Sequence, residues 1–293
     1  LLHGKSAFMN SIKNKEEYQK ALAHVIQHAE FNEDIVEFVD YVTSQKGNIP
    51  FCIRRLRSYC EANAIVSWFR DKDLIGFKQW CYIAAKLNRM VIQFDPIGWF
   101  PAYEHFSALL SDNEEIISWY SQHRVSYDRQ GSIKDRDNPR KPDFHGYQLI
   151  LALNHEWDKL RERCELILQT DLKKDKKYLI DHRFYLALAN GDKNEIENVL
   201  TELTSPKIAK VRNFEFAFTF TEHFIATHAV IYTKLAWRNG YQLNIDTPWI
   251  PKEWLPVEPL LEYPEPWEFM REFDIFTPFE GEWKDWSPKR DNR

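Results

Sequence analysis

The sequence predicts an all-α fold of stacked antiparallel helical hairpins, an irregular repeat-like array or bundle, with an extended Pro/Trp-rich C-terminal segment packed on it. Two observations predict the helices. Apolar residues step by three and four almost everywhere up to Gly240, and polar corners recur near residues 71, 112, 155 and 191. This spacing suits stacked helical hairpins but is too irregular for the tetratricopeptide pattern. The third observation is a change of composition after Asp246.

Periodicity predicts the first four helices and their boundaries. Asn32 stands directly before a helical run, where an Asn side chain commonly caps the first turn. Gly47 and Pro50 break the chain, and the polar stretch RDKD at 70–73 forms the corner of the longest predicted hairpin. The helices predicted from this spacing cover residues 16–29, 31–42, 51–69 and 74–94.

Two later corners repeat one sequence arrangement. In SALLSDNEEIISWY (107–120) and ALANGDKNEIENVL (187–200), an Asp precedes a Glu by three residues. We expect Asp112 and Asp192 to accept hydrogen bonds from the free backbone N–H groups of the next helix. Glu115 and Glu195 would then reach back to the cap. Gly191 would end the preceding helix in the left-handed conformation that glycine tolerates, so each stretch predicts a tight helix–turn–helix corner.

Two segments between the hairpins are less regular. Residues 126–143, SYDRQGSIKDRDNPRKPD, contain almost no apolar side chains and are predicted to form a loop that links two halves of one array. FEFAFTFT at 214–221 alternates like a strand, yet its phenylalanines also form two rows at i, i+4 spacing. We predict one buried helix that runs on to Gly240, with Arg238 in its last turn.

The C-terminal segment differs from the rest of the chain in composition and charge. Eight of the 14 prolines and five of the 11 tryptophans lie between Thr247 and Pro288. Proline at this density prevents long helices, and the tryptophans favour a segment that packs against the helical body, with Trp249 and Trp254 sealing it. From Asp246 to Glu280, nine acidic residues face two basic ones, a net charge of −7 that exceeds the −5 of the whole chain.

Length and charge limit the class of protein. We assign residues 9–245 to one helical-hairpin domain and 246–293 to an acidic extension of it, and 293 residues give room for a large core. Met9 is typical of a natural start, so residues 1–8 are expected to be a cloning remnant. The net charge disfavours direct nucleic-acid or anionic-membrane binding and suits a basic partner. The sequence contains no run of 18 apolar residues, and its first residues, LLHGKSAF, are not expected to be a signal peptide.

No stretch of the sequence predicts catalysis or cofactor binding. The motifs GxxxxGK[ST], GxGxxG, GxSxG and HExxH are all absent. His24 and His28 lie one turn apart without a third ligand at suitable spacing, and His223 and His228 face different sides of a helix. We therefore predict no catalytic residue, no cofactor and no metal. The cysteines have no CxxC spacing and are predicted to be buried free thiols of a reducing compartment: Cys52, Cys60, Cys81 and Cys164.

The stretch IYTKLAWRNGYQLNIDTPWIPKEWLPVEPL, residues 231–260, follows a recognisable pattern of the form lAxxxGyxlxxDxpxIPxelL. It resembles the immunity protein 49 family of bacterial polymorphic toxin systems. The helical corners at 108–116 and 187–196 also look similar to that family's layout, and the likeness would extend over roughly residues 15 to 265. The matching positions are Leu235, Ala236, Gly240, Tyr241, Asp246, Ile250, Pro251, Trp254 and Leu255.

The resemblance implies a cytoplasmic, mostly helical protein without enzymatic activity. Such a protein binds and neutralises a cognate toxin domain in interbacterial competition, including toxins delivered by type VI secretion. The acidic extension is where this chain departs from the family, and its charge suits a basic toxin that acts on nucleic acid or nucleotides. We expect occlusion of the toxin's active site and leave the oligomeric state open. The candidate contact residues are Glu258, Glu262, Glu265, Glu268 and Glu272.

Two other functions fit the same sequence. A helical-repeat scaffold would bind several cellular partners rather than one. A hydrolase or lipid-modifying enzyme of helical fold would bring histidines and carboxylates together around a closed pocket. The three hypotheses therefore differ in the number of partners and in the presence of such a pocket.

Overall fold

The protein is all α-helical, as its sequence predicts. A computed structural model describes residues 15–94, 102–122, 137–170, 176–209, 212 and 220–280, and no β-strand occurs among them. Short 3-10 helices cover Ala102–His105, Lys176–Tyr178 and Lys252–Trp254. The α-helices are α2 (Lys15–Ala29), α3 (Glu33–Thr43), α4 (Ile49–Phe69), α5 (Leu74–Phe94), α6 (Phe106–Ser111), α7 (Glu114–Gln122), α8 (Pro142–Leu153), α9 (Trp157–Gln169), α10 (Leu179–Asn190), α11 (Lys193–Leu203), α13 (Thr227–Arg238) and α14 (Glu268–Arg271).

Four hairpins, α4–α5, α6–α7, α8–α9 and α10–α11, turn at corners that share one backbone feature. Each corner contains one residue with φ between 57° and 69°, the left-handed conformation that ends many helices. The corners predicted near 71, 112, 155 and 191 are therefore confirmed. The left-handed residues are Lys72, Asp112, His155 and Gly191.

The capping prediction is right for Asp192 and wrong for Asp112. Asp192 Oδ1 accepts a hydrogen bond from the Glu195 N–H at 3.0 Å. At the earlier corner, Asn113 Oδ1 accepts from the Ile116 N–H, and Asp112 is the left-handed residue that ends α6. This corner has no glycine, and Asp adopts the left-handed conformation more readily than most residues. Asp112 therefore takes the left-handed position, and the next residue, Asn113, caps α7. The Asp112 side chain is therefore available for a different contact.

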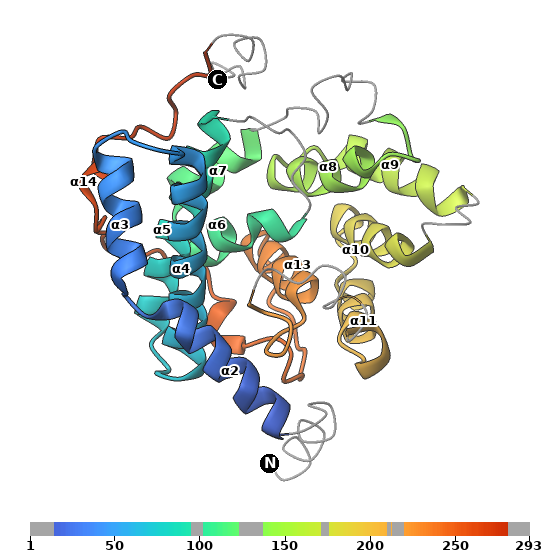
Figure 1. Cartoon of the computed structure of the whole chain (residues 1–293). Helices are drawn as coiled ribbons and strands as arrows, with labels where there is room; N and C mark the ends of the chain where they lie inside the picture. The colour runs from blue at the N-terminus through green and yellow to red at the C-terminus, as the bar shows by residue number, and fades with distance from the viewer. Residues whose placement is uncertain are drawn as a thin grey trace.

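The helices enclose one main core. α4 and α5 pair along their length, α2 and α3 pack on α4, and α13 contacts both α6 and α11. In Figure 1, α13 lies between the side formed by α4 to α6 and the side formed by α10 and α11. All four cysteines are buried free thiols, as predicted. Nearly all buried apolar side chains of the described ranges belong to a single cluster, so the predicted array closes into a bundle around α13.

The helix before Gly240 is shorter than its periodicity predicts. α13 begins at Thr227 and residues 220–226 form turns, so the continuous helix is wrong over this stretch. The Ala226 N–H donates to the Trp249 carbonyl at 3.0 Å, a contact with the C-terminal segment that replaces a helical bond. α13 ends at Arg238 as predicted. Residues 213–219, which include most of FEFAFTFT, lie outside the described residues, as do residues 126–136 of the predicted loop and residues 1–14.

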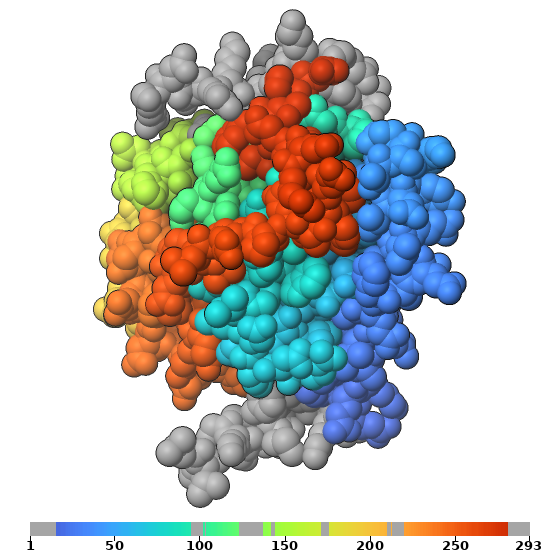
Figure 2. Space-filling model, turned by 90° about the vertical axis from the view of Figure 1, so that its left-hand side faces the viewer, coloured from blue at the N-terminus to red at the C-terminus, as the bar shows by residue number. Residues whose placement is uncertain are grey.

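The C-terminal segment is mainly extended and packs on the helices, as predicted. Trp254 is fully buried and stacks on Phe77 of α5, with ring centroids 4.0 Å apart. Trp249 is half-buried against the same core. We name residues 255–280 the C-terminal strap. Figure 2 shows the strap, orange to red, crossing the face formed by the cyan residues of the α4–α5 hairpin.

Candidate partner-binding surface

The C-terminal strap is held by a row of polar side chains along one face of α5. Their spacing of four, four, three and four residues keeps them on that face. They donate hydrogen bonds to strap residues from Glu258 to Pro278 in ascending order, so the strap runs parallel to α5. An extended, proline-rich backbone cannot satisfy its own carbonyl groups, and the helix side chains do so instead. The row consists of Lys78, Tyr82, Lys86, Arg89 and Gln93.

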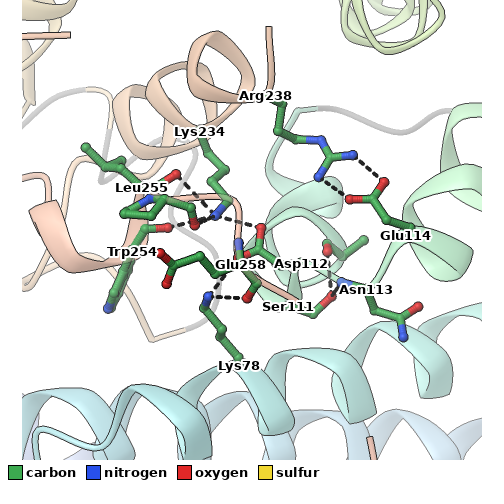
Figure 3. A network of polar contacts seen from close by, with 12 residues as sticks. Lys78, Ser111, Asp112, Asn113, Glu114, Lys234, Arg238, Trp254, Leu255 and Glu258 are labelled. Atoms are coloured by element: carbon green, nitrogen blue, oxygen red, sulfur yellow. Dashed lines mark hydrogen bonds and ion pairs between the residues drawn. The ribbon is translucent and has the colours of Figure 1, made fainter. Parts of the chain in front are cut away.

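A buried carboxylate connects the start of the strap to two helices (Figure 3). Asp112 Oδ1 lies 2.7 Å from Lys234 Nζ on α13, and Oδ2 lies 2.9 Å from Lys78 Nζ on α5. Both ammonium groups also donate to strap carbonyls, Lys78 to Glu258 at 2.6 Å and Lys234 to Pro256 at 2.8 Å. Burial lowers the pKa of Lys234 from 10.5 to about 8, against the opposing effect of Asp112. The strap carbonyls therefore help to stabilise two ammonium groups that share one carboxylate.

Glu265 fixes the middle of the strap. Its Oε1 accepts a hydrogen bond from Tyr82 Oη at 2.7 Å and pairs with Lys86 Nζ. The Glu265 side chain is only 10% exposed, and burial followed by this hydrogen bond raises the pKa of Tyr82. Of the five predicted contact residues, Glu265 therefore makes its contacts within the protein, between the strap and α5. The other four are exposed: Glu258, Glu262, Glu268 and Glu272.

The far end of the strap is held by Arg89, which is fully buried. Its Nε donates to the Ile275 carbonyl at 2.6 Å and its Nη2 to the Thr277 carbonyl at 2.7 Å. The guanidinium carbon lies 4.5 Å from the centroid of the Trp119 ring, within the range of a cation–π interaction. One arginine therefore holds two strap carbonyls and an aromatic ring of α7 together.

The extended backbone divides the strap into an inner and an outer face. Side chains alternate between the two sides of an extended chain, and the exposure of residues 262–268 follows this alternation. Tyr263, Glu265 and Trp267 are half-buried on the inner face, whereas Glu262 and Glu268 are exposed. Eight of the nine acidic residues between 246 and 280 are exposed. The negative charge of this segment is therefore displayed at the surface.

The structure brings together one cysteine–histidine pair that sequence spacing does not indicate. Cys164 Sγ lies 3.9 Å from His182 Nδ1, and His182 Nε2 lies 2.8 Å from His145 Nδ1. Burial raises the pKa of the Cys164 thiol to about 12 and lowers that of His182 well below its usual value. A buried, protonated thiol beside a neutral imidazole is not an activated nucleophile. The three residues come from α8, α9 and α10, so only their packing reveals the contact.

A groove of about 280 Å³ lies between α7, the α8–α9 corner and the end of α13. It is open to solvent, and its charged residues Glu114 and Arg238 pair with each other at 2.6 Å. Its other polar lining residues are Ser118, Ser121, His155 and Asn239. Its lining residues include no pair of convergent carboxylates, so this groove does not match the closed pocket expected of a hydrolase.

The histidine pairs of the sequence lie in different surroundings. The rings of His24 and His28 contact each other, with centroids 4.6 Å apart. His228 is buried in α13, whereas His223 lies in the turn before it. Within the described ranges, no group of three or more His, Cys, Asp or Glu side chains could hold a metal ion. None of the helices in that part of the chain has the length and apolar character that crossing a bilayer requires.

A comparison with protein families agrees with the sequence pattern of residues 231–260, which begins in α13. A family model described as immunity protein 49 matches residues 149–254, from within α8 to the buried Trp254. The C-terminal strap lies beyond the matched residues. A search of curated proteins and a search of solved structures each returned no match. The resemblance to immunity protein 49 that the sequence indicates is thereby confirmed over residues 149–254.

Proposed function

We propose that this protein is an immunity protein that binds a cognate bacterial toxin domain and neutralises it. The family match over residues 149–254 carries the proposal, because the immunity protein 49 family implies an immunity function. Binding rather than chemistry also agrees with the described residues, where the cysteine–histidine pair is buried and unactivated. We propose that inhibition is steric, with the bound protein covering the toxin's active site.

The C-terminal strap supports a basic protein partner. Five exposed glutamates lie on it, and complementary charge speeds the encounter of two proteins. Its backbone is held at several carbonyls by α5 and α13, so little conformational freedom remains to be lost on binding. A toxin that acts on nucleic acid or nucleotides needs a positive surface for phosphate groups. We therefore propose such a toxin as the partner, with the strap as part of the interface.

Protection from the toxin tests the proposal. The tagged chain is used as bait in the native bacterium, and the retained toxin domain is then expressed in a bacterial host with and without this protein. We expect growth arrest by the toxin alone, rescue by co-expression, and a stoichiometric complex on gel filtration. Several unrelated partners would favour the scaffold, and arrest that persists despite abundant folded protein would contradict an immunity function.

Steric inhibition makes a separate kinetic prediction. With the purified toxin domain, added immunity protein should raise the apparent KM and leave kcat unchanged, because substrate and inhibitor then exclude each other. A lowered kcat with unchanged KM would point instead to a change of the toxin's conformation. Reversing the charges of Glu258, Glu262 and Glu268 should slow association while the melting temperature stays nearly constant, since all three are exposed.

A further inference from the structure

A fully exposed leucine lies on the strap next to acidic residues in the chain. Leu261 is 107% exposed, and Val257 is 36% exposed. Glu258 and Glu262, both exposed, directly follow them in the chain. Within six residues the strap thus presents two apolar and two acidic side chains to solvent. Ile75, 69% exposed, lies one turn of α5 before the lysine that holds the Glu258 carbonyl.

The position of Leu261 is set by its neighbours. The Leu260 N–H donates to Tyr263 Oη at 3.0 Å, and Tyr263 Oη donates to the Ser111 carbonyl at 2.7 Å. The Tyr263 ring also packs against Tyr82 of α5, with centroids 4.9 Å apart. These contacts hold the backbone at Leu260, which is half-buried, while Leu261 is exposed. Proline residues at 259 and 264 further restrict the backbone around it.

Single exposed apolar residues are common on protein surfaces and need no explanation. Leu261 differs in its surroundings, because residues 257–262 present a second exposed apolar side chain and two exposed carboxylates on a backbone that Tyr263 braces. Because the backbone beside Leu261 is already held, little backbone entropy is lost when a partner buries this side chain. The two exposed carboxylates of the same segment favour a partner whose matching pocket is bordered by Lys and Arg.

We infer that Leu261 is the apolar anchor by which the strap binds the basic toxin domain, with Glu258 and Glu262 paired to cations at the rim of the pocket. This inference rests on the proposed immunity function. It assigns different kinetic roles to the two kinds of side chain. The buried anchor limits dissociation, whereas the rim charges act on association.

Variants separate these roles on the complex of the full chain with the toxin domain that it neutralises. Leu261→Ser should dissociate at least about tenfold faster, with an association rate within about twofold of the original. Glu258→Lys combined with Glu262→Lys should associate about tenfold more slowly at low salt, and high salt should reduce the difference. Leu166→Ser is the matched control, because Leu166 is 47% exposed on α9 and should change neither rate.

A photo-crosslinker gives a readout that does not depend on affinity. Benzoylphenylalanine is placed at position 261, or at position 166 as control, in the full chain co-expressed with the toxin domain. We expect an adduct with the toxin domain from position 261 only. Protection without such an adduct, together with unchanged dissociation of Leu261→Ser, would overturn the anchor and leave the immunity function intact. An adduct between two copies of this chain would also overturn it, and absence of protection by the unmodified chain would remove both proposals.

Discussion

Asp112 and Lys234 form an ion pair of 2.7 Å in which both side chains are fully buried. The carboxylate belongs to the left-handed residue at the α6–α7 corner, and the ammonium belongs to the central helix α13. Lys78 of α5 completes the cluster at 2.9 Å. Because both lysines also bind strap carbonyls, one carboxylate joins the corner, two helices and the strap. Breaking a buried pair is strongly destabilising even where its formation adds little stability, so we expect this cluster to hold the strap in position.

Replacing Asp112 by Asn tests the buried charge with little change of shape. Asn adopts the left-handed conformation readily, so the backbone is preserved while two buried lysines lose their counter-ion. We expect the free energy of unfolding in urea at pH 7 to fall by about 3–5 kcal/mol. Asp192→Asn at the exposed corner should change it by less than about 0.5 kcal/mol, because Asn caps a helix as well as Asp. A loss below about 1 kcal/mol for Asp112→Asn would contradict the assigned role.

The inner and outer glutamates of the strap should differ in their effect on stability. Glu265→Gln leaves Lys86, whose side chain is 8% exposed, without its carboxylate partner, and we expect a loss of about 2 kcal/mol. Glu268→Gln changes an exposed residue and should cost less than about 0.5 kcal/mol. Thermal and urea unfolding of both variants measure the difference. Equal stabilities would show that the Glu265 contacts do not hold the strap.

Alanine substitutions identify the residue that caps α7. Asn113→Ala and Asp192→Ala should each lower the free energy of unfolding by about 1 kcal/mol, because each removes a side-chain acceptor for a free helical N–H. Glu115→Ala should be nearly neutral, since this residue is exposed. Glu195 pairs with Arg183 at 2.9 Å instead of reaching back to its cap. If Asn113→Ala leaves the free energy of unfolding unchanged, Asn113 is not the residue that caps α7, and Asp112 becomes the candidate again.

Three buried histidines should make the protein sensitive to mild acid. Burial lowers the pKa of His105 to about 3 and the pKa values of His182 and His228 well below 6.5. Below pH 6.5 the unfolded chain takes up protons at these positions and the folded chain does not. Their contribution to stability is therefore complete above pH 6.5 and is lost as the pH falls toward the folded-state pKa values. For His105, whose folded-state pKa is about 3, the loss at pH 5 is about 2 kcal/mol.

Urea unfolding at pH 7.5, 6 and 5 measures this dependence. His182→Gln removes one of the three groups and should reduce the slope between pH 6.5 and 5 by about a third. His155→Asn serves as the control, because His155 is an exposed corner residue whose left-handed backbone Asn also adopts. A free energy of unfolding that stays constant from pH 7.5 to 5 would contradict burial of the three imidazoles in their neutral form.

Prediction from sequence succeeded where a feature depends on residues close along the chain. The boundaries of α5 follow from apolar periodicity, and Asn32 caps α3 as its position indicates. The prediction of where α13 starts was wrong, because the Ala226 N–H donates to the carbonyl of Trp249 rather than to a carbonyl of the preceding turn. The first residue of α13 therefore depends on a contact with a distant segment, which the spacing of apolar residues in the sequence does not reveal.

The glutamates proposed as partner contacts show the same limit of prediction from sequence. Counting charges correctly indicated an acidic segment. It could not show that Glu265, unlike the neighbouring glutamates, is bound by Lys86 and Tyr82 inside the protein. Alternation in an extended segment was the signal that separates the inner from the outer residues. The choice of face still depends on the register of the strap along α5, which side chains of that helix set through strap carbonyls.

Local sequence was thus sufficient for the helical hairpins, their four corners and the acidic C-terminal segment, because periodicity, turn residues and charge act over a few neighbouring residues. Packing between distant segments was needed to bury Asp112 beneath the strap and to leave Leu261 outside it. A carboxylate is stable in the interior only where cations from other elements meet it. An extended strap acquires inner and outer faces only when a helix binds one of them.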